Sequence, residues 1–88
     1  MKVRFKSSFV RDLGDLKDAA LLERIKQVIN SVEAAQNLAE LSNVKKLRGG
    51  GDYFRVRLGE SRLGLAFEED AVVFVRALHR REIYRYFP

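Results

Sequence analysis

The chain has four short segments typical of β-strands: apolar and polar residues alternate in the first three, and the last is almost wholly apolar. The first segment, "KVRFK", has Val3 and Phe5 as its apolar members. The other three follow one another in the second half of the chain. We expect strands at residues 2–6, 53–58, 61–67 and 72–78.

Apolar residues recur at helical spacing between the first and second of these strands, which predicts two helices. We expect the shorter helix to begin with Ser7 or Ser8 as its N-cap, and the longer one to begin after Asp18. The longer helix has an apolar stripe made of Leu21, Leu22, Ile25, Val28, Ile29 and Val32. Residues 36–47 are expected to connect it to the second strand.

The predicted elements follow one another in the order β-α-α-β-β-β, and residues 79–88 add a short helix or tail. A chain of 88 residues has material for one hydrophobic core, so we expect a single domain over residues 1–88. The element order predicts an α+β fold, in which a small antiparallel sheet carries the two N-terminal helices on one face.

The dipeptide Gly59-Glu60 separates two predicted strands and indicates a tight hairpin with a type II′ turn. This turn sets Arg57 opposite Arg62 and Arg55 opposite Gly64. Directly opposed residues share a face, so the three arginines gather on the side away from the helices. Opposed like charges are destabilising, and a folded chain accepts that cost more readily where an anion binds between them.

The register of the last strand depends on the loop "EED" at residues 68–70. A three-residue loop sets Arg62 opposite Arg76 and Gly64 opposite Phe74. A two-residue loop would push Arg76 into the core, so we expect the three-residue loop. The open face then has a basic rim, a floor of small residues and the ring of Phe74, unless the C-terminal segment covers that ring. Such a groove suits RNA.

The charge of the chain supports a polyanionic partner. The 17 Lys and Arg residues outnumber the 12 Asp and Glu residues, and after residue 44 ten basic residues face six acidic ones. Most of these ten are arginines, whose planar guanidinium binds phosphate through two parallel hydrogen bonds. The alternative is a solvated basic surface with no ligand.

Composition also excludes several classes of protein. The chain has no cysteine, which excludes disulfides and thiolate metal sites, and no apolar run approaches the roughly 20 residues of a membrane span. We expect a soluble, cytoplasmic protein with no cofactor, no metal and no membrane partner.

The run "VKKLRGG…YFRVRLGESRLGLAF…VVFVRALHRREIY" resembles the core of the RelE/ParE superfamily of toxin–antitoxin toxins. That core has a basic block of the form L-x-G…Y-R-x-R-x-G…Y-R, then a hydrophobic strand and an H-R-x-x-x-Y ending. The preceding strand and two helices follow the superfamily's order, so the resemblance covers nearly the whole chain.

The RelE-like branch of this superfamily implies an endoribonuclease that cleaves mRNA, often on the ribosome, without a metal ion. The reaction is attack of a ribose 2′-hydroxyl on the adjacent phosphate, and preorganised guanidiniums stabilise the charge that develops. By position, the resemblance assigns this role to Arg55, Arg57, Arg62 and Arg80, and it matches Tyr84 to the tyrosine of the family's ending.

One departure from the best-known RelE-like pattern concerns the proton. Two strand positions that are lysines in that pattern are arginines here, and arginine stays protonated, so a lysine base is ruled out. His79, Tyr84 and Glu60 remain as groups able to move a proton, and we count His79 among the catalytic candidates. Other basic side chains are expected to bind RNA, namely Lys45, Lys46, Arg48, Arg76 and Arg81.

The resemblance also implies partners. A RelE-like toxin acts on mRNA and the ribosome and is held inactive by a cognate antitoxin, for which acidic segments and an amphipathic helix are expected. The ParE-like branch instead inhibits DNA gyrase without cleaving RNA, which makes gyrase the alternative partner. A nucleic-acid-binding module without activity is the third possibility.

Overall fold

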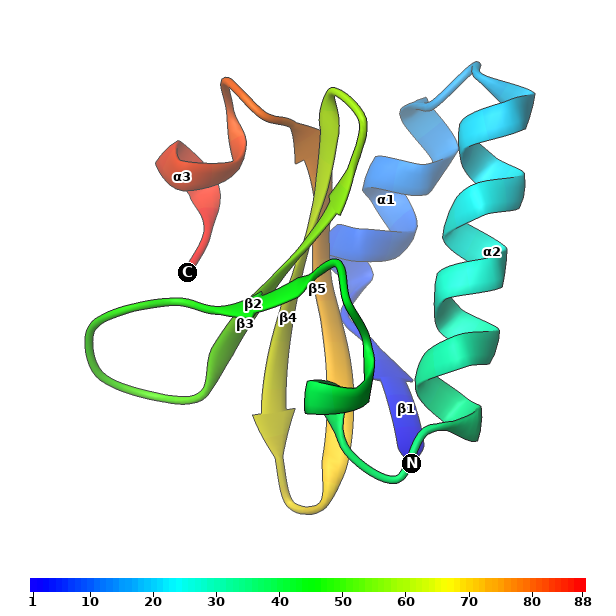
Figure 1. Ribbon diagram of the computed structural model, residues 1–88. Helices are drawn as coiled ribbons and strands as arrows, with labels where there is room; N and C mark the ends of the chain where they lie inside the picture. Colours follow the sequence, from blue (N-terminus) through cyan, green and yellow to red (C-terminus); the bar gives the residue numbers. More distant parts are fainter.

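The computed structural model describes residues 1–88 and shows one sheet with helices on both faces (Figure 1). Helices α1 and α2 cover one face, and the short helix α3 lies on the other (Figure 1). The predicted α+β class, the two N-terminal helices on one face and the short C-terminal helix are confirmed. The elements are β1 (Lys2–Phe5), α1 (Ser7–Asp15), α2 (Ala19–Ala34), the 3₁₀ turn η1 (Leu38–Glu40), β2 (Val44–Lys46), β3 (Tyr53–Leu58), β4 (Ser61–Glu68), β5 (Ala71–His79) and α3 (Ile83–Tyr86).

The sheet has five strands in the order β1-β5-β4-β3-β2. Strand β1 runs parallel to β5, with Lys2 opposite Ala71 and Phe5 opposite Phe74, whereas all other pairs are antiparallel. The prediction of a wholly antiparallel sheet is therefore wrong. Side chains alternate with the same period in parallel and antiparallel strands, so the pattern of β1 could not reveal its direction.

Strand β2 lies in the segment predicted to be a connector, and it pairs antiparallel with β3 through Lys45 opposite Arg55. Its three residues, Val44–Lys46, are too few for a period of two to be recognised.

The β3–β4 hairpin has the predicted register, with Arg57 opposite Arg62 and Arg55 opposite Gly64. Gly59 has a φ of 60°, and Glu60 is not among the residues with positive φ, as a type II′ turn requires. Glycine adopts this conformation without a steric penalty.

The β4–β5 hairpin differs from the prediction. Its turn is the two-residue Glu69-Asp70, with φ values of 48° and 63° as in a type I′ turn. Phe74 consequently lies opposite Leu65 rather than Gly64, and it is fully buried beneath the helices. The expected aromatic ring on the open face is therefore absent.

An irregularity between Gly64 and Leu65 explains why this shorter turn does not bury Arg76. Beyond Phe74 the register shifts by one residue, so that Arg76 lies opposite Gly64 and not opposite the buried Leu63, where the two-residue turn alone would place it. The predicted pairing of Arg76 with Arg62 is therefore wrong. The extra residue in β5 is a β-bulge, which moves the following side chains to the other face. A two-residue loop therefore does not place an unpartnered arginine in the core, which was the reason for expecting the longer loop.

The hydrophobic core lies between the sheet and the pair α1 and α2. Three aromatic rings, Phe5, Phe9 and Phe74, pack together with centroids 5.3–5.9 Å apart. Phe9 and Phe74 are buried, whereas Phe5 is 46% exposed. The other buried members of the core are Ile25, Val32, Leu38, Val56, Leu58, Leu63, Leu65, Val72 and Ala77.

The two helix starts differ in how they are capped. Asp18 caps α2 as predicted, since its carboxylate accepts a hydrogen bond from Leu21 N at 3.0 Å. Helix α1 begins after Lys6 with no side-chain cap, so the predicted serine cap is wrong. Ser8 instead donates to the carbonyl oxygen of Val75 at 2.6 Å. Neither helix is long and apolar enough to span a bilayer.

Candidate functional site

Cross-strand pairing builds two rows of side chains on the face that carries α3. In one row Lys45, Arg55, Gly64 and Arg76 follow one another across β2, β3, β4 and β5. In the other, Arg57 lies opposite Arg62, which lies opposite Leu78. Residues directly opposite each other share a face, so pairing alone brings these cations together.

An open hollow of about 600 Å³ lies at the β2 side of these rows, and we call it the arginine hollow. Three of its seven lining residues are cationic and none is acidic. A concave surface of one charge concentrates ions of the opposite charge. The lining residues are Ser42, Asn43, Val44, Lys45, Arg55, Arg57 and Gly59.

Asn43 is the part of the hollow that sequence reasoning missed. Its backbone oxygen accepts from Arg57 N at 3.1 Å, and its side-chain Nδ2 donates to Arg57 O at 3.3 Å. These bonds extend the pairing of β2 with β3 and fix the strand that carries Arg57. Asn43 was missed because residues 36–47, which include β2, were assigned to a connector.

Arg55 has an unusual donor within the hollow. Its Nε is buried and has no hydrogen-bond partner. A buried donor without a partner costs about 1–3 kcal/mol or more, which an anionic acceptor would recover. Arg57 is exposed and takes part in no ion pair.

Arg62 stands beside Arg57 but is partly engaged by the hairpin turn. Its Nη1 donates to the carbonyl oxygens of Gly59 and Ser61, at 2.5 and 2.9 Å. These bonds hold the guanidinium near the turn.

Glu60 joins the hairpin tip to the start of the C-terminal segment. Its carboxylate lies 2.7 Å from Arg80 Nε and 3.9 Å from His79 Nε2, and its backbone oxygen accepts from Arg80 N at 2.8 Å. Both side chains of the Glu60–Arg80 pair are more than half exposed, at 67% and 52%. An exposed pair contributes at most about 1 kcal/mol, so a phosphate can compete with Glu60 for Arg80.

His79 is held by a second contact. Its Nδ1 accepts a hydrogen bond from Arg81 N at 3.1 Å. In the neutral ring the proton therefore sits on Nε2, the nitrogen nearer Glu60. Neither ring nitrogen then presents a free lone pair.

The C-terminal segment covers part of the face that was expected to be open. Ile83 and Phe87 are buried, and a Cβ built on Gly64 would lie 2.7 Å from the ring of Phe87. Phe87 also meets Tyr53 edge to face at 5.6 Å. The predicted open floor of small residues is therefore wrong, because Phe87 fills it. Tyr84 points outward from α3 and is 61% exposed.

Arg76 differs from the other arginines because it has an acidic partner. Its Nε and Nη2 donate to the two carboxylate oxygens of Asp12, at 2.8 and 3.0 Å. Asp12 also accepts from Ala77 N at 2.9 Å, and the guanidinium lies 5.4 Å from the ring centroid of Tyr86. The hydrogen bonds to Asp12 raise the pKa of Arg76. Nothing in the sequence pattern of α1 indicated this role for Asp12.

The remaining basic residues predicted to bind RNA lie apart from the hollow. Lys46 points to the opposite face from Lys45 and forms an ion pair with Asp52 at 3.4 Å. Arg48 and Arg81 are exposed, the first in the β2–β3 loop and the second after β5. The structure thus brings Lys45, Arg55 and Arg57 into one hollow, places Arg62 beside them and gathers His79 and Arg80 at the hairpin tip. No group of three or more metal-ligating side chains lies close together.

Two curated proteins resemble the chain in sequence. The toxin RelE3 of Methanocaldococcus jannaschii is 38% identical over 89 residues, which cover 100% of both proteins. The putative toxin RelE1 of the same organism is 31% identical over 75 residues, 82% of this chain and 83% of that protein. No protein-family model matches the chain.

Solved structures of RelE proteins have a fold similar to that of this chain. A chain of the RelB–RelE antitoxin–toxin complex from Methanococcus jannaschii has a TM-score of 0.81 and 34% identity, covering 97% of this chain and 99% of that one. A chain of the archaeal RelE–RelB complex from Pyrococcus horikoshii OT3 has a TM-score of 0.71 and 24% identity, covering 90% and 93%. The second likeness concerns the fold alone.

Proposed function

Because the chain belongs to the RelE family of toxins, we propose that it is the toxin of a RelBE-type toxin–antitoxin system and that it cleaves mRNA on the ribosome. The matches to RelE toxins favour this branch over the ParE-like gyrase inhibitor. Membership of the family supports the toxin role, and the chemistry of the arginine hollow supports cleavage of RNA.

The observation that carries the proposal is the buried, unpartnered Nε of Arg55 in a hollow lined by three cations and no acid. A phosphate of the RNA backbone supplies both the missing acceptor and the missing negative charge. We assign Arg55, Arg57 and Lys45 to the phosphate at which cleavage occurs.

The reaction begins with attack of the 2′-hydroxyl oxygen on the adjacent phosphorus. The bond between O2′ and phosphorus forms, the bond between phosphorus and O5′ breaks, and the products are a 2′,3′-cyclic phosphate and a free 5′-hydroxyl. One proton leaves the 2′-hydroxyl and one reaches the 5′ oxygen. Arg55, Arg57, Arg62 and Arg80 stabilise the negative charge on the phosphorane oxygens, which is greatest in the transition state.

We assign the removal of the 2′-hydroxyl proton to Glu60 rather than to His79. The carboxylate of Glu60 is exposed at the hairpin tip next to Gly59, whereas the Nδ1 lone pair of His79 is taken by Arg81 N. Tyr84 is exposed on α3, where it can orient the substrate. Cleavage by E60Q, H79A and Y84F should be compared across pH. If the acid limb disappears only in H79A, the base is His79.

The second partner is an antitoxin. Solved complexes of the two archaeal relatives pair RelE with RelB, and the basic surface of this chain suits a partner with acidic segments. A neighbouring gene for a small protein of this kind should restore growth when it is expressed together with the toxin. A folded chain that is harmless when expressed alone would contradict the toxin role.

The direct test is incubation of the purified protein with translating ribosomes and labelled mRNA, followed by mapping of the cleavage ends. We expect ends bearing a cyclic phosphate and a 5′-hydroxyl, and no such ends with R55A. Intact mRNA together with a defect in DNA supercoiling would establish the gyrase alternative instead.

A further inference from the structure

Arg24 of α2 carries a further guanidinium to the tip of the β3–β4 hairpin. A Cβ built on Gly59 would lie 3.6 Å from Arg24 Nη1. Arg24 is exposed and takes part in none of the ion pairs. Although α2 covers the other face of the sheet, this side chain therefore reaches the turn that borders the arginine hollow.

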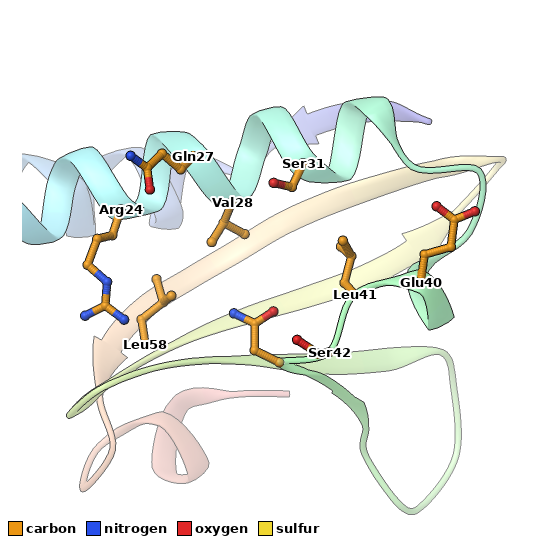
Figure 2. Close-up of a pocket in the computed structure, with 9 residues that line it drawn as sticks. Arg24, Gln27, Val28, Ser31, Glu40, Leu41, Ser42 and Leu58 are labelled. Carbon is orange, nitrogen blue, oxygen red and sulfur yellow. The ribbon is translucent and has the colours of Figure 1, made fainter.

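Arg24 lines a second hollow, of about 390 Å³, between α2 and the segment that leads into β2 (Figure 2). Figure 2 shows the guanidinium of Arg24 beside Leu58 at one end and Glu40 at the opposite end. Amide and hydroxyl groups, including those of Gln27 and Ser42, line the hollow between these two charges. The end that holds Arg24 is therefore positive, and the other end would repel an anion.

The two hollows are neighbours. Ser42 and Asn43 line both of them, and Gly59 of the arginine hollow follows Leu58 of the second one. A strand that lies in the arginine hollow can therefore pass Asn43 at the edge of the sheet and reach Arg24. Polar groups along this path can bond to phosphate and sugar oxygens, the usual protein contacts of a nucleic-acid backbone.

We propose that Arg24 binds a backbone phosphate of the RNA strand where the strand leaves the arginine hollow; this inference rests on the proposed function. The strand makes one phosphate contact there, because Glu40 limits its further course. An acidic protein segment is the other class of ligand, and we favour RNA for two reasons. The second hollow continues the arginine hollow, and only three of its nine lining residues are hydrophobic, too few for the apolar face of a helix.

The test measures binding of a fluorescein-labelled single-stranded RNA of 12 nucleotides over a series of salt concentrations. The RNA carries 2′-O-methyl groups, which prevent cleavage. Losing one phosphate contact lowers the slope of log K against log salt by about 0.7 for a single strand. We expect this decrease, with a several-fold weaker affinity, in R24A but not in R24K.

Lys26 provides the matched control, because it is exposed on the same helix, has the same charge and lines neither hollow. K26A should keep the wild-type slope. A trinucleotide that fills only the arginine hollow should bind wild type and R24A equally.

Equal slopes for R24A and K26A on the 12-nucleotide RNA would overturn the inference while leaving the proposed function intact. Failure of the wild type to bind RNA would overturn the proposed function as well. A loss of polyglutamate binding in R24A, with RNA binding unchanged, would assign Arg24 to an acidic protein partner instead.

Discussion

Arg55 and Arg76 belong to one cross-strand row, on either side of Gly64, yet their surroundings are opposite. The buried Nε of Arg55 has no partner, whereas Nε of Arg76 lies 2.8 Å from Asp12. An arginine that already has a carboxylate supports the fold, and one that lacks an acceptor is available to a ligand. The number of arginines in a sequence does not distinguish these two roles.

The difference arises from the length of β1. Strand β1 ends at Phe5, so the edge of β5 beyond Phe74 has no neighbouring strand. Helix α1 supplies hydrogen-bond partners for this edge instead, because Ser8 donates to Val75 O and Asp12 accepts from Ala77 N. Arg76 emerges from this edge and completes the hydrogen bonding of Asp12. At the β2 side of the sheet no acidic side chain approaches the arginines in this way.

The pKa of Arg76 has a simple consequence for stability. The hydrogen bonds to Asp12 raise it, and burial, which lowers it, only partly offsets them. A base whose pKa is raised by folding stabilises the folded state at all pH values below its unfolded pKa, and this contribution is lost only as pH rises through the folded value. For arginine that range is strongly alkaline, so Arg76 remains charged at any pH at which the protein is used.

The largest expected effect comes from removing the partner of Arg76. D12A leaves a partly buried guanidinium and the amide of Ala77 without their acceptor. We expect the free energy of unfolding, measured with urea, to fall by about 3–5 kcal/mol, as for other broken buried ion pairs. Asp15, exposed in the same helix, is the control, and D15A should change stability by less than about 0.5 kcal/mol. A D12A protein as stable as D15A would show that the contrast between the two regions has no energetic basis.

The next effect concerns catalysis at the other region. R57A removes an unpartnered charge from the hollow, so cleavage should fall by about 100-fold or more, which is about 2.7 kcal/mol. The unfolding free energy should not decrease. R80A should behave similarly, since its ion pair with Glu60 is exposed. If R57A lowered stability and left cleavage unchanged, Arg57 would belong with Arg76 as a structural arginine.

A smaller effect separates two adjacent lysines. Lys45 lines the hollow, whereas Lys46 points to the other face and pairs with Asp52. K45A should weaken RNA binding by about 1 kcal/mol, the size of a partly exposed charge contact, and should lower the salt slope. K46A should change neither quantity in a fluorescence anisotropy titration. Equal losses would mean that net charge, rather than position, governs binding.

The smallest effect is a gain in stability. Arg57 and Arg62 oppose each other across the hairpin, and a pair of like charges there costs about 0.2–1 kcal/mol. R57Q should therefore raise the unfolding free energy by a few tenths of a kcal/mol, and the gain should shrink at high salt. A decrease on this substitution would indicate that the opposed guanidiniums do not repel.

The sequence predicted the region of the free arginines better than the region of the partnered one. Alternation and a two-residue turn fix a hairpin register, so Arg55, Arg57 and Arg62 were placed correctly on one face. The β-bulge after Phe74 has no residue signature, and together with the wrong loop length it is why the predicted register set Arg76 opposite Arg62 instead of Gly64. The ion pair with Asp12 joins residues far apart in the chain, which local patterns do not report.

Covering of the open face by the C-terminal segment was named from the sequence as an alternative, but the residues that do it were not. Ile83 and Phe87 are four residues apart, in a segment too short for a period to be established. Their burial depends on the space above Gly64, which only the assembled sheet defines.

The pairing of β1 with β5 also determines when the sheet can be completed during synthesis of the chain. Lys2 cannot pair until Ala71 has been synthesised, and Phe5 and Phe9 cannot pack on Phe74 until that residue has been added to the chain. Contacts between such distant parts of a chain form late in folding, and a domain emerging from a ribosome folds as a unit. Arg80 and Tyr84 follow still later in the chain. A nascent chain in which β5 has not yet emerged therefore lacks the completed sheet and the aromatic packing of its core.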